Sequence, residues 1–159
     1  MNYTLFTEKI LSIARSLAAM QLLADHDGDG DGPHPLTPLL DDFRKPVVRQ
    51  LMLQAYIDMT LNLRRYIDDA YIPEPDSEFD RFTLSIITPS GFGSVEADLL
   101  LAAMEQFIAL STATAVLRSW HPDDLRPAEA FSTLAAEYLA KALSLLSPQF
   151  PRAITPCFG

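Results

Sequence analysis

The segment from residue 97 to residue 117 constrains the fold most, because it is a long and strongly apolar run. It nevertheless contains Asp98, Glu105 and Gln106. A carboxylate at the centre of a bilayer costs about 3 kcal/mol, which argues against a membrane span. A helix that is apolar on most sides must instead be covered by other elements. We therefore expect a buried central helix from Ser94 to about Trp120.

Three further segments place apolar residues at the three- and four-residue steps of a helix. The first runs from about Thr4 to Ala24, the second from Pro46 to about Ala70, and the last from Pro127 to Leu146. At 159 residues the chain has the length of one ordinary domain. We therefore expect a mainly α fold, a four-helix bundle-like single domain spanning residues 1–159.

The segment from residue 81 to residue 88, RFTLSIIT, alternates apolar and polar residues as a β-strand does. A strand needs partners, because its backbone N–H and C=O groups must be hydrogen-bonded. Residues 153–155 are a poor partner, since they are few and precede Pro156. We therefore expect a small β element, with a strand at about 81–88 that pairs in an irregular hairpin or with a neighbouring subunit. The candidate interaction residues are Phe82, Leu84, Ile86, Phe92 and Ile154.

Between the first two predicted helices, aspartates alternate with other residues from position 25 to position 31. This matches the opening D-x-D-x-D-G of a calcium-binding loop, in which carboxylates converge on a hard cation. The twelfth position of such a loop would be Leu36, where a bidentate glutamate is required. Two interpretations stay open: a flexible solvated loop over residues 25–35, and a calcium site. The candidate metal ligands are Asp25, Asp27, Asp29 and Asp31.

Charge and motif content limit the function classes. The net charge of -9 argues against direct, sequence-specific nucleic-acid binding, which needs clustered Lys and Arg. Cys157 is the single cysteine, so the fold does not depend on an internal disulfide. No nucleophile elbow, phosphate-binding loop or glycine fingerprint is present. Residues 148–159 are rich in proline and predict an extended tail.

The order of these elements is two N-terminal helices, the β element at 81–88, and a helix that ends in VLRSW at 116–120. A proline- and aspartate-containing loop, the last helix and the proline-rich tail follow. This layout resembles the small helical proteins of the head-to-tail connector and neck modules of tailed phages and prophages. The resemblance covers roughly residues 40–150 and is one of architecture, without a specific motif. It implies ring assembly, contacts with portal and tail proteins, and a DNA conduit whose acidic lining would repel phosphates.

We therefore expect a non-enzymatic structural or assembly protein that acts through protein–protein contacts, as a phage head–tail connector or neck component in a homo-oligomeric ring. Its location would be the virion if it is phage-derived, and otherwise the cytoplasm. Two alternatives stay open. One is a calcium-responsive helical binding or regulatory module that uses the loop from Asp25 to Asp31, and calcium is then the cofactor. The other is a small helical enzyme of unknown class.

Overall fold

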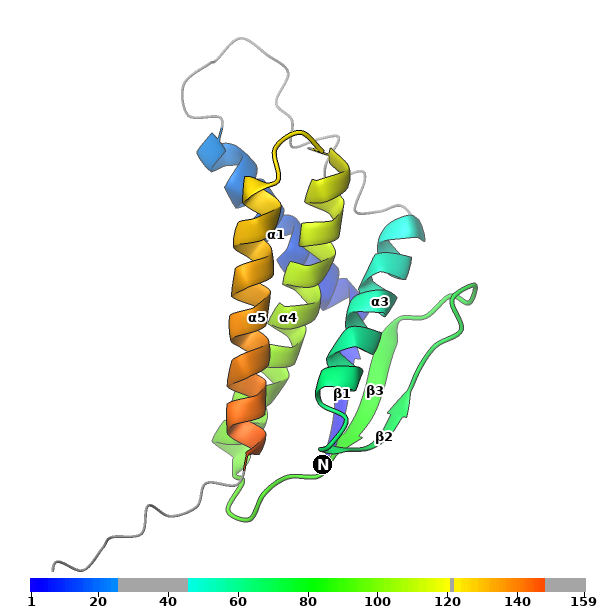
Figure 1. Cartoon of the computed structure of the whole chain (residues 1–159). Helices are drawn as coiled ribbons and strands as arrows, with labels where there is room; N and C mark the ends of the chain where they lie inside the picture. Colours follow the sequence, from blue (N-terminus) through cyan, green and yellow to red (C-terminus); the bar gives the residue numbers. More distant parts are fainter. Residues whose placement is uncertain (26–45, 121, 148–159) are drawn as a thin grey trace, which may run out of the picture.

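The computed structural model describes residues 1–25, 46–120 and 122–147 (Figure 1). Its elements, in chain order, are β1 (Asn2–Phe6), α1 (Thr7–Asp25), α3 (Pro46–Asn62), β2 (Ile67–Tyr71), β3 (Arg81–Ile86), α4 (Ser94–Trp120) and α5 (Arg126–Leu146). The three strands form one antiparallel sheet in the order β1-β3-β2. The predicted mainly α fold with a small β element is therefore confirmed.

Helix α4 is the centre of the fold, and α1, α3 and α5 each pack mainly against it. Figure 1 shows α5 running beside α4 on one side, with α3 and the sheet on the other. In a four-helix bundle, each helix would also pack against its neighbours around a shared core. The finer prediction of a four-helix bundle is therefore not confirmed. The predicted bounds of α4 and α5 agree with the structure to within a residue.

The composition of α4 explains its central position. Its core positions are almost completely buried, among them Leu100, Met104 and Ile108. Its buried threonines satisfy their hydroxyls within the helix: Thr112 donates to the Ile108 carbonyl at 2.8 Å, and Thr114 donates to the carbonyl one turn before it at 2.7 Å. A helix that carries polar side chains in this way can be enclosed without leaving unpaired groups.

The N-terminus forms a strand that we did not expect from the sequence. Residues Asn2–Phe6 pair antiparallel with β3, and the helix begins at Thr7 instead of at Thr4. Both the N–H and the hydroxyl of Thr7 donate to the Asp80 carbonyl at 3.0 Å, which joins the start of α1 to the start of β3. Of the two pairings expected for the strand near residues 81–88, the one within the chain occurs: β2 and β3 form an irregular hairpin, and β1 is a second partner that the sequence did not suggest.

The second partner of β3 lies in a segment that we predicted as helix. Helix α3 ends at Asn62, and residues Ile67–Tyr71 form strand β2. The register of β2 against β3 shifts between Ile67 and Asp69, which is a β-bulge. The bulge puts Ile67 and Ala70, three residues apart, on the half-buried side of the strand. Apolar residues three apart are typical of a helix, so the bulge hid the strand.

The inner face of the sheet packs against α3. Leu5, Phe82 and Ile86 are almost completely buried there. The rings of Tyr56 and Phe82 stack, with their centroids 4.2 Å apart. The Tyr56 hydroxyl lies 3.2 Å from the carbonyls of both Tyr71 and Thr83. This tyrosine therefore ties α3 to two neighbouring strands.

Candidate interaction surfaces

The groups with shifted pKa values in the described part of the chain are explained by the fold. Burial, followed by the charge of Asp69, raises the pKa of Tyr56 to about 12. Burial, followed by the charge of Asp98, raises the pKa of Tyr3. These hydroxyls belong to residues of the inner sheet face and its helix, so their shifts reflect packing. They do not mark a reacting group in a cleft.

Two ion pairs involve charged side chains of the described residues, one with a buried partner and one on the surface. Lys9 of α1 and Glu105 of α4 lie 2.7 Å apart (Nζ to Oε2), and the Glu105 side chain is only 5% exposed. The acidic residue in the middle of the apolar run is therefore neutralised by the neighbouring helix. On the surface, the guanidinium of Arg81 donates two hydrogen bonds to Asp80. These bonds lower the pKa of the Asp80 carboxyl and raise that of Arg81.

Most of the predicted metal ligands lie outside the described residues. Asp25 is the last residue of α1, and Asp27, Asp29 and Asp31 fall in the range 26–45 that the structure does not describe. Within residues 1–25, 46–120 and 122–147, no three His, Cys, Asp or Glu side chains are grouped so that they could hold a metal ion. The calcium site stays a prediction.

The predicted interaction residues have different locations. Phe82, Leu84 and Ile86 lie in the core of the chain itself, and Phe92 is half-buried against that core. Ile154 lies outside the described residues. The interaction role of the three strand residues was inferred from a missing strand partner, and β1 and β2 supply that partner within the chain.

No element among the described residues covers the opposite side of the sheet, which we call the outer sheet face. It consists of the outward-pointing residues of the three strands: Asn2, Thr4, Phe6, Asp69, Tyr71, Arg81, Thr83 and Ser85. A shallow depression of about 370 Å³ lies along it. The guanidinium carbon of Arg81 lies 5.4 Å from the centroid of the Phe6 ring. Hydroxyl groups and exposed aromatic rings therefore share this face.

Sequence reasoning missed this surface, although part of its signal was visible. The N-terminal residues NYTLF alternate polar and apolar residues before helical spacing begins. Tyr3 and Leu5 point into the core, so Thr4 and Phe6 point outward. The bulged strand β2 carried no such alternation, and its outer residues Asp69 and Tyr71 could not have been found in this way.

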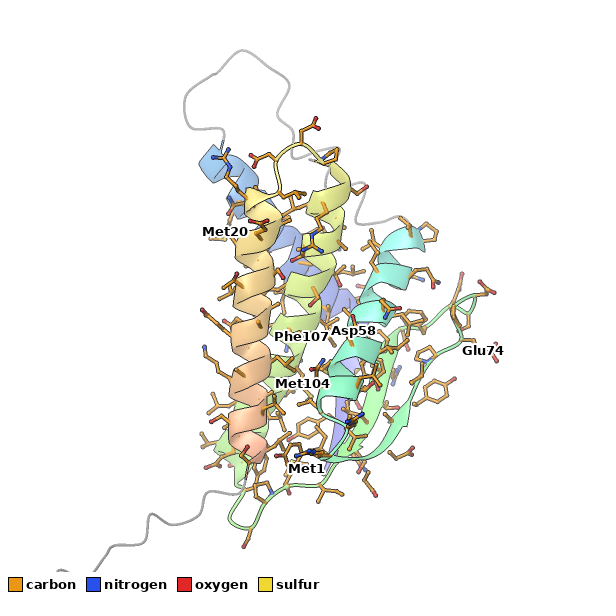
Figure 2. All side chains as sticks on the ribbon, viewed as in Figure 1. Met1, Met20, Asp58, Glu74, Met104 and Phe107 are labelled. Carbon is orange, nitrogen blue, oxygen red and sulfur yellow. The ribbon has the colours of Figure 1, made fainter. Side chains whose placement is uncertain are left out.

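A groove of about 480 Å³ separates α3 from α5, with α4 as its floor. We call it the α3/α5 groove. Figure 2 labels Asp58 on the α3 wall of this groove and Phe107 on its α4 floor. Its α5 wall consists of small and apolar residues, including Ala136 and Leu139, and Leu61 of α3 is 60% exposed at its rim.

A second groove, of about 330 Å³, lies between the first turns of α4 and the last turns of α5. We call it the α4/α5 groove. Leu99, Tyr138 and Leu145 line it, and the ammonium of Lys141 lies 4.6 Å from the centroid of the Tyr138 ring. Leu99 and Val95, one turn apart on α4, are both more than half exposed. Helix α5 is therefore flanked by a groove on each side.

Helix α4 is also the one helix among the described residues that is long and apolar enough to cross a membrane. By composition the candidate span runs from Ser94 to Ser119, but 67% of its most apolar window is buried inside the protein. Length and composition are weak indicators here, because a core helix passes the same test.

These features define a mainly helical domain with a small three-stranded sheet and with exposed grooves on both sides of α5. Comparison of the chain with models of protein families, with curated proteins and with solved structures gave no match.

Proposed function

We propose that this protein is a non-enzymatic assembly component that acts by binding other protein chains. The observation that carries the proposal is the partial cover of α5. This helix packs mainly against α4 and has an open groove on each side. Exposed leucines lie at both grooves, at Leu61 and Leu99. The α4/α5 groove is mainly apolar, and the α3/α5 groove combines apolar residues with polar ones such as Asp58 and Arg118. Exposed grooves of this kind can receive a helix or loop of a neighbouring chain.

The more specific proposal is a head–tail connector or neck component of a tailed phage, assembled as a ring. It is supported by the resemblance in element order, in which the last two helices follow a small β element. The strong acidity of the chain is compatible with a channel for DNA, because like charges keep phosphates from adhering. In a ring, the α3/α5 groove of one copy would receive a surface of the next, which is a head-to-tail contact.

The experiment measures the mass and shape of the full chain by light scattering and electron microscopy, alone and mixed with the portal protein of a tailed phage. We expect rings, or a complex with the portal protein. A protein that stays monomeric at high concentration and does not bind the portal protein would contradict the proposal.

Two variants with the same chemical change test whether the α3/α5 groove carries the contact. Ala136→Arg places a charged side chain in the groove, whereas Ala140→Arg changes an exposed α5 position that lines neither groove. Alanine and arginine both have high helix propensity, so neither substitution should disturb α5 itself. We expect Ala136→Arg to lower the assembled fraction and Ala140→Arg to leave it unchanged. Equal loss in both variants would exclude this groove as the contact.

A further inference from the structure

Strand β2 forms an open edge of the sheet. It pairs with β3 on one side only, and Figure 1 shows no described element beyond it. An edge strand offers backbone N–H and C=O groups to which another extended chain can bind. The other features of β2 decide which kind of chain would fit there.

The direction of the backbone groups follows from the pairing. The N–H of Ile87 donates to the Tyr66 carbonyl at 2.7 Å, and Asp69 and Tyr71 continue this pairing opposite Ser85 and Thr83. Alternate residues of a strand turn their backbone groups to opposite sides. Ala70, between Asp69 and Tyr71, therefore turns its N–H and C=O away from β3 and toward the open edge.

The charge at this edge is negative. Asp68 and Asp69 are exposed and β2 contains no basic residue, although the exposed Arg64 and Arg65 stand shortly before the strand. The connection to β3 adds exposed acidic residues, and Figure 2 shows Glu74 at the margin of the molecule on the β2 side. Pairing with β2 of a second copy would add two further aspartates to an edge that already has two, which is unfavourable. A segment with Lys or Arg would instead meet opposite charges.

We propose that the β2 edge binds an extended segment of another protein that carries Lys or Arg at alternate positions. The segment adds to the sheet as a further strand and bonds to the backbone of Ala70. Its basic side chains lie on the outer sheet face beside Asp69 and over the ring of Tyr71, which is 64% exposed. Its other side chains lie beside Ala70 and are small. This inference rests on the proposed function, because it names the kind of segment by which an assembly partner is held.

The experiment uses the full chain and a nine-residue peptide of alternating Lys and Thr with blocked ends. Calorimetry measures its affinity, and hydrogen exchange measures the protection of the Ala70 amide. We expect binding and slower exchange at Ala70. A Lys–Pro peptide keeps the charge but cannot continue a β ladder, so we expect it not to bind. Equal binding of the Lys–Pro peptide, an unchanged Ala70 amide, or no binding of the Lys–Thr peptide would overturn the proposal.

Two variants with the same change in net charge locate the site. Asp69→Asn should weaken binding about three- to fivefold, the effect of one exposed charge pair. Asp123→Asn, at an exposed loop position remote from β2, should leave the affinity unchanged. Equal weakening by both would mean non-specific attraction and would overturn the proposal. Assembly is measured separately by light scattering. If the protein assembles but does not bind the peptide, this inference alone is refuted. If it binds the peptide but does not assemble, the proposed function alone is refuted.

Discussion

On the inner face of the sheet, Leu5 and Phe82 are completely buried, whereas on the outer face Thr4 and Tyr71 remain exposed. The two sets of residues alternate along the same strands, so each strand contributes to both faces. The inner residues hold α3 and α4 against the sheet, whereas the outer residues are exposed or half-buried. We therefore expect changes on the inner face to alter stability, and changes on the outer face to alter binding with little change in stability.

The largest effect should come from the inner face. Phe82→Ala removes a buried ring that stacks on Tyr56, and we expect it to lower the free energy of unfolding by about 3–5 kcal/mol. Urea denaturation measures this loss. Phe82→Leu, which keeps most of the volume, is the control and should lose clearly less. A loss below about 1 kcal/mol for Phe82→Ala would mean that the inner face is not the stabilising one.

The hydroxyl of Tyr56 should have a smaller, pH-dependent effect. Tyr56→Phe removes its contacts with two strand carbonyls, and we expect a loss of about 1 kcal/mol near neutral pH. Because the folded pKa is raised to about 12, the unfolded chain, with a tyrosine pKa near 10, releases its proton first. This contribution is therefore fully present below pH 10 and is lost as the pH rises toward 12.

The measurement for this prediction is chemical denaturation of both proteins at several alkaline pH values. The difference in stability between wild type and Tyr56→Phe should shrink, and then change sign, as the pH approaches 12. A difference that stays constant from pH 8 to pH 12 would show that Tyr56 titrates in the same way in the folded and unfolded chain.

The smallest effect should come from the outer face. Tyr71→Thr keeps a residue that favours strands and removes an exposed ring, so we expect the free energy of unfolding to change by no more than about 0.5 kcal/mol. Thermal unfolding measures this change. The same variant should bind the Lys–Thr peptide more weakly. A large loss of stability would remove the distinction between the two faces.

The long helices α4 and α5 could be predicted because their sequence patterns are strong. The apolar run that forms α4 is too long for a strand, and the apolar residues of α5 recur at the period of a helix. Strand β3 could also be predicted, because Phe82, Leu84 and Ile86 alternate without interruption. The location of its partners was harder, since strand pairing joins segments that are remote in sequence and leaves no local pattern.

The candidate surfaces depend on this missing information. The outer sheet face requires β1 and β2 to lie on either side of β3, which no local pattern states. The apolar residues around Ile67 fit helical spacing as well as a bulged strand, so composition alone could not decide between them. The grooves beside α5 depend on which helices pack against α4. The apolar residues on one face of a helix show that it packs against something, but not against which helix.

The pairing of β1 with β3 has a consequence for synthesis of the chain. Tyr3 lies opposite Leu84, so β1 leaves the ribosome long before its partner exists. At about 5–20 residues per second, the delay is on the order of ten seconds, and the central helix α4 emerges later still. During this interval the nascent chain has apolar strands and helices with nothing to cover them. The sheet and its helices can therefore close into one domain only after α4 has been made.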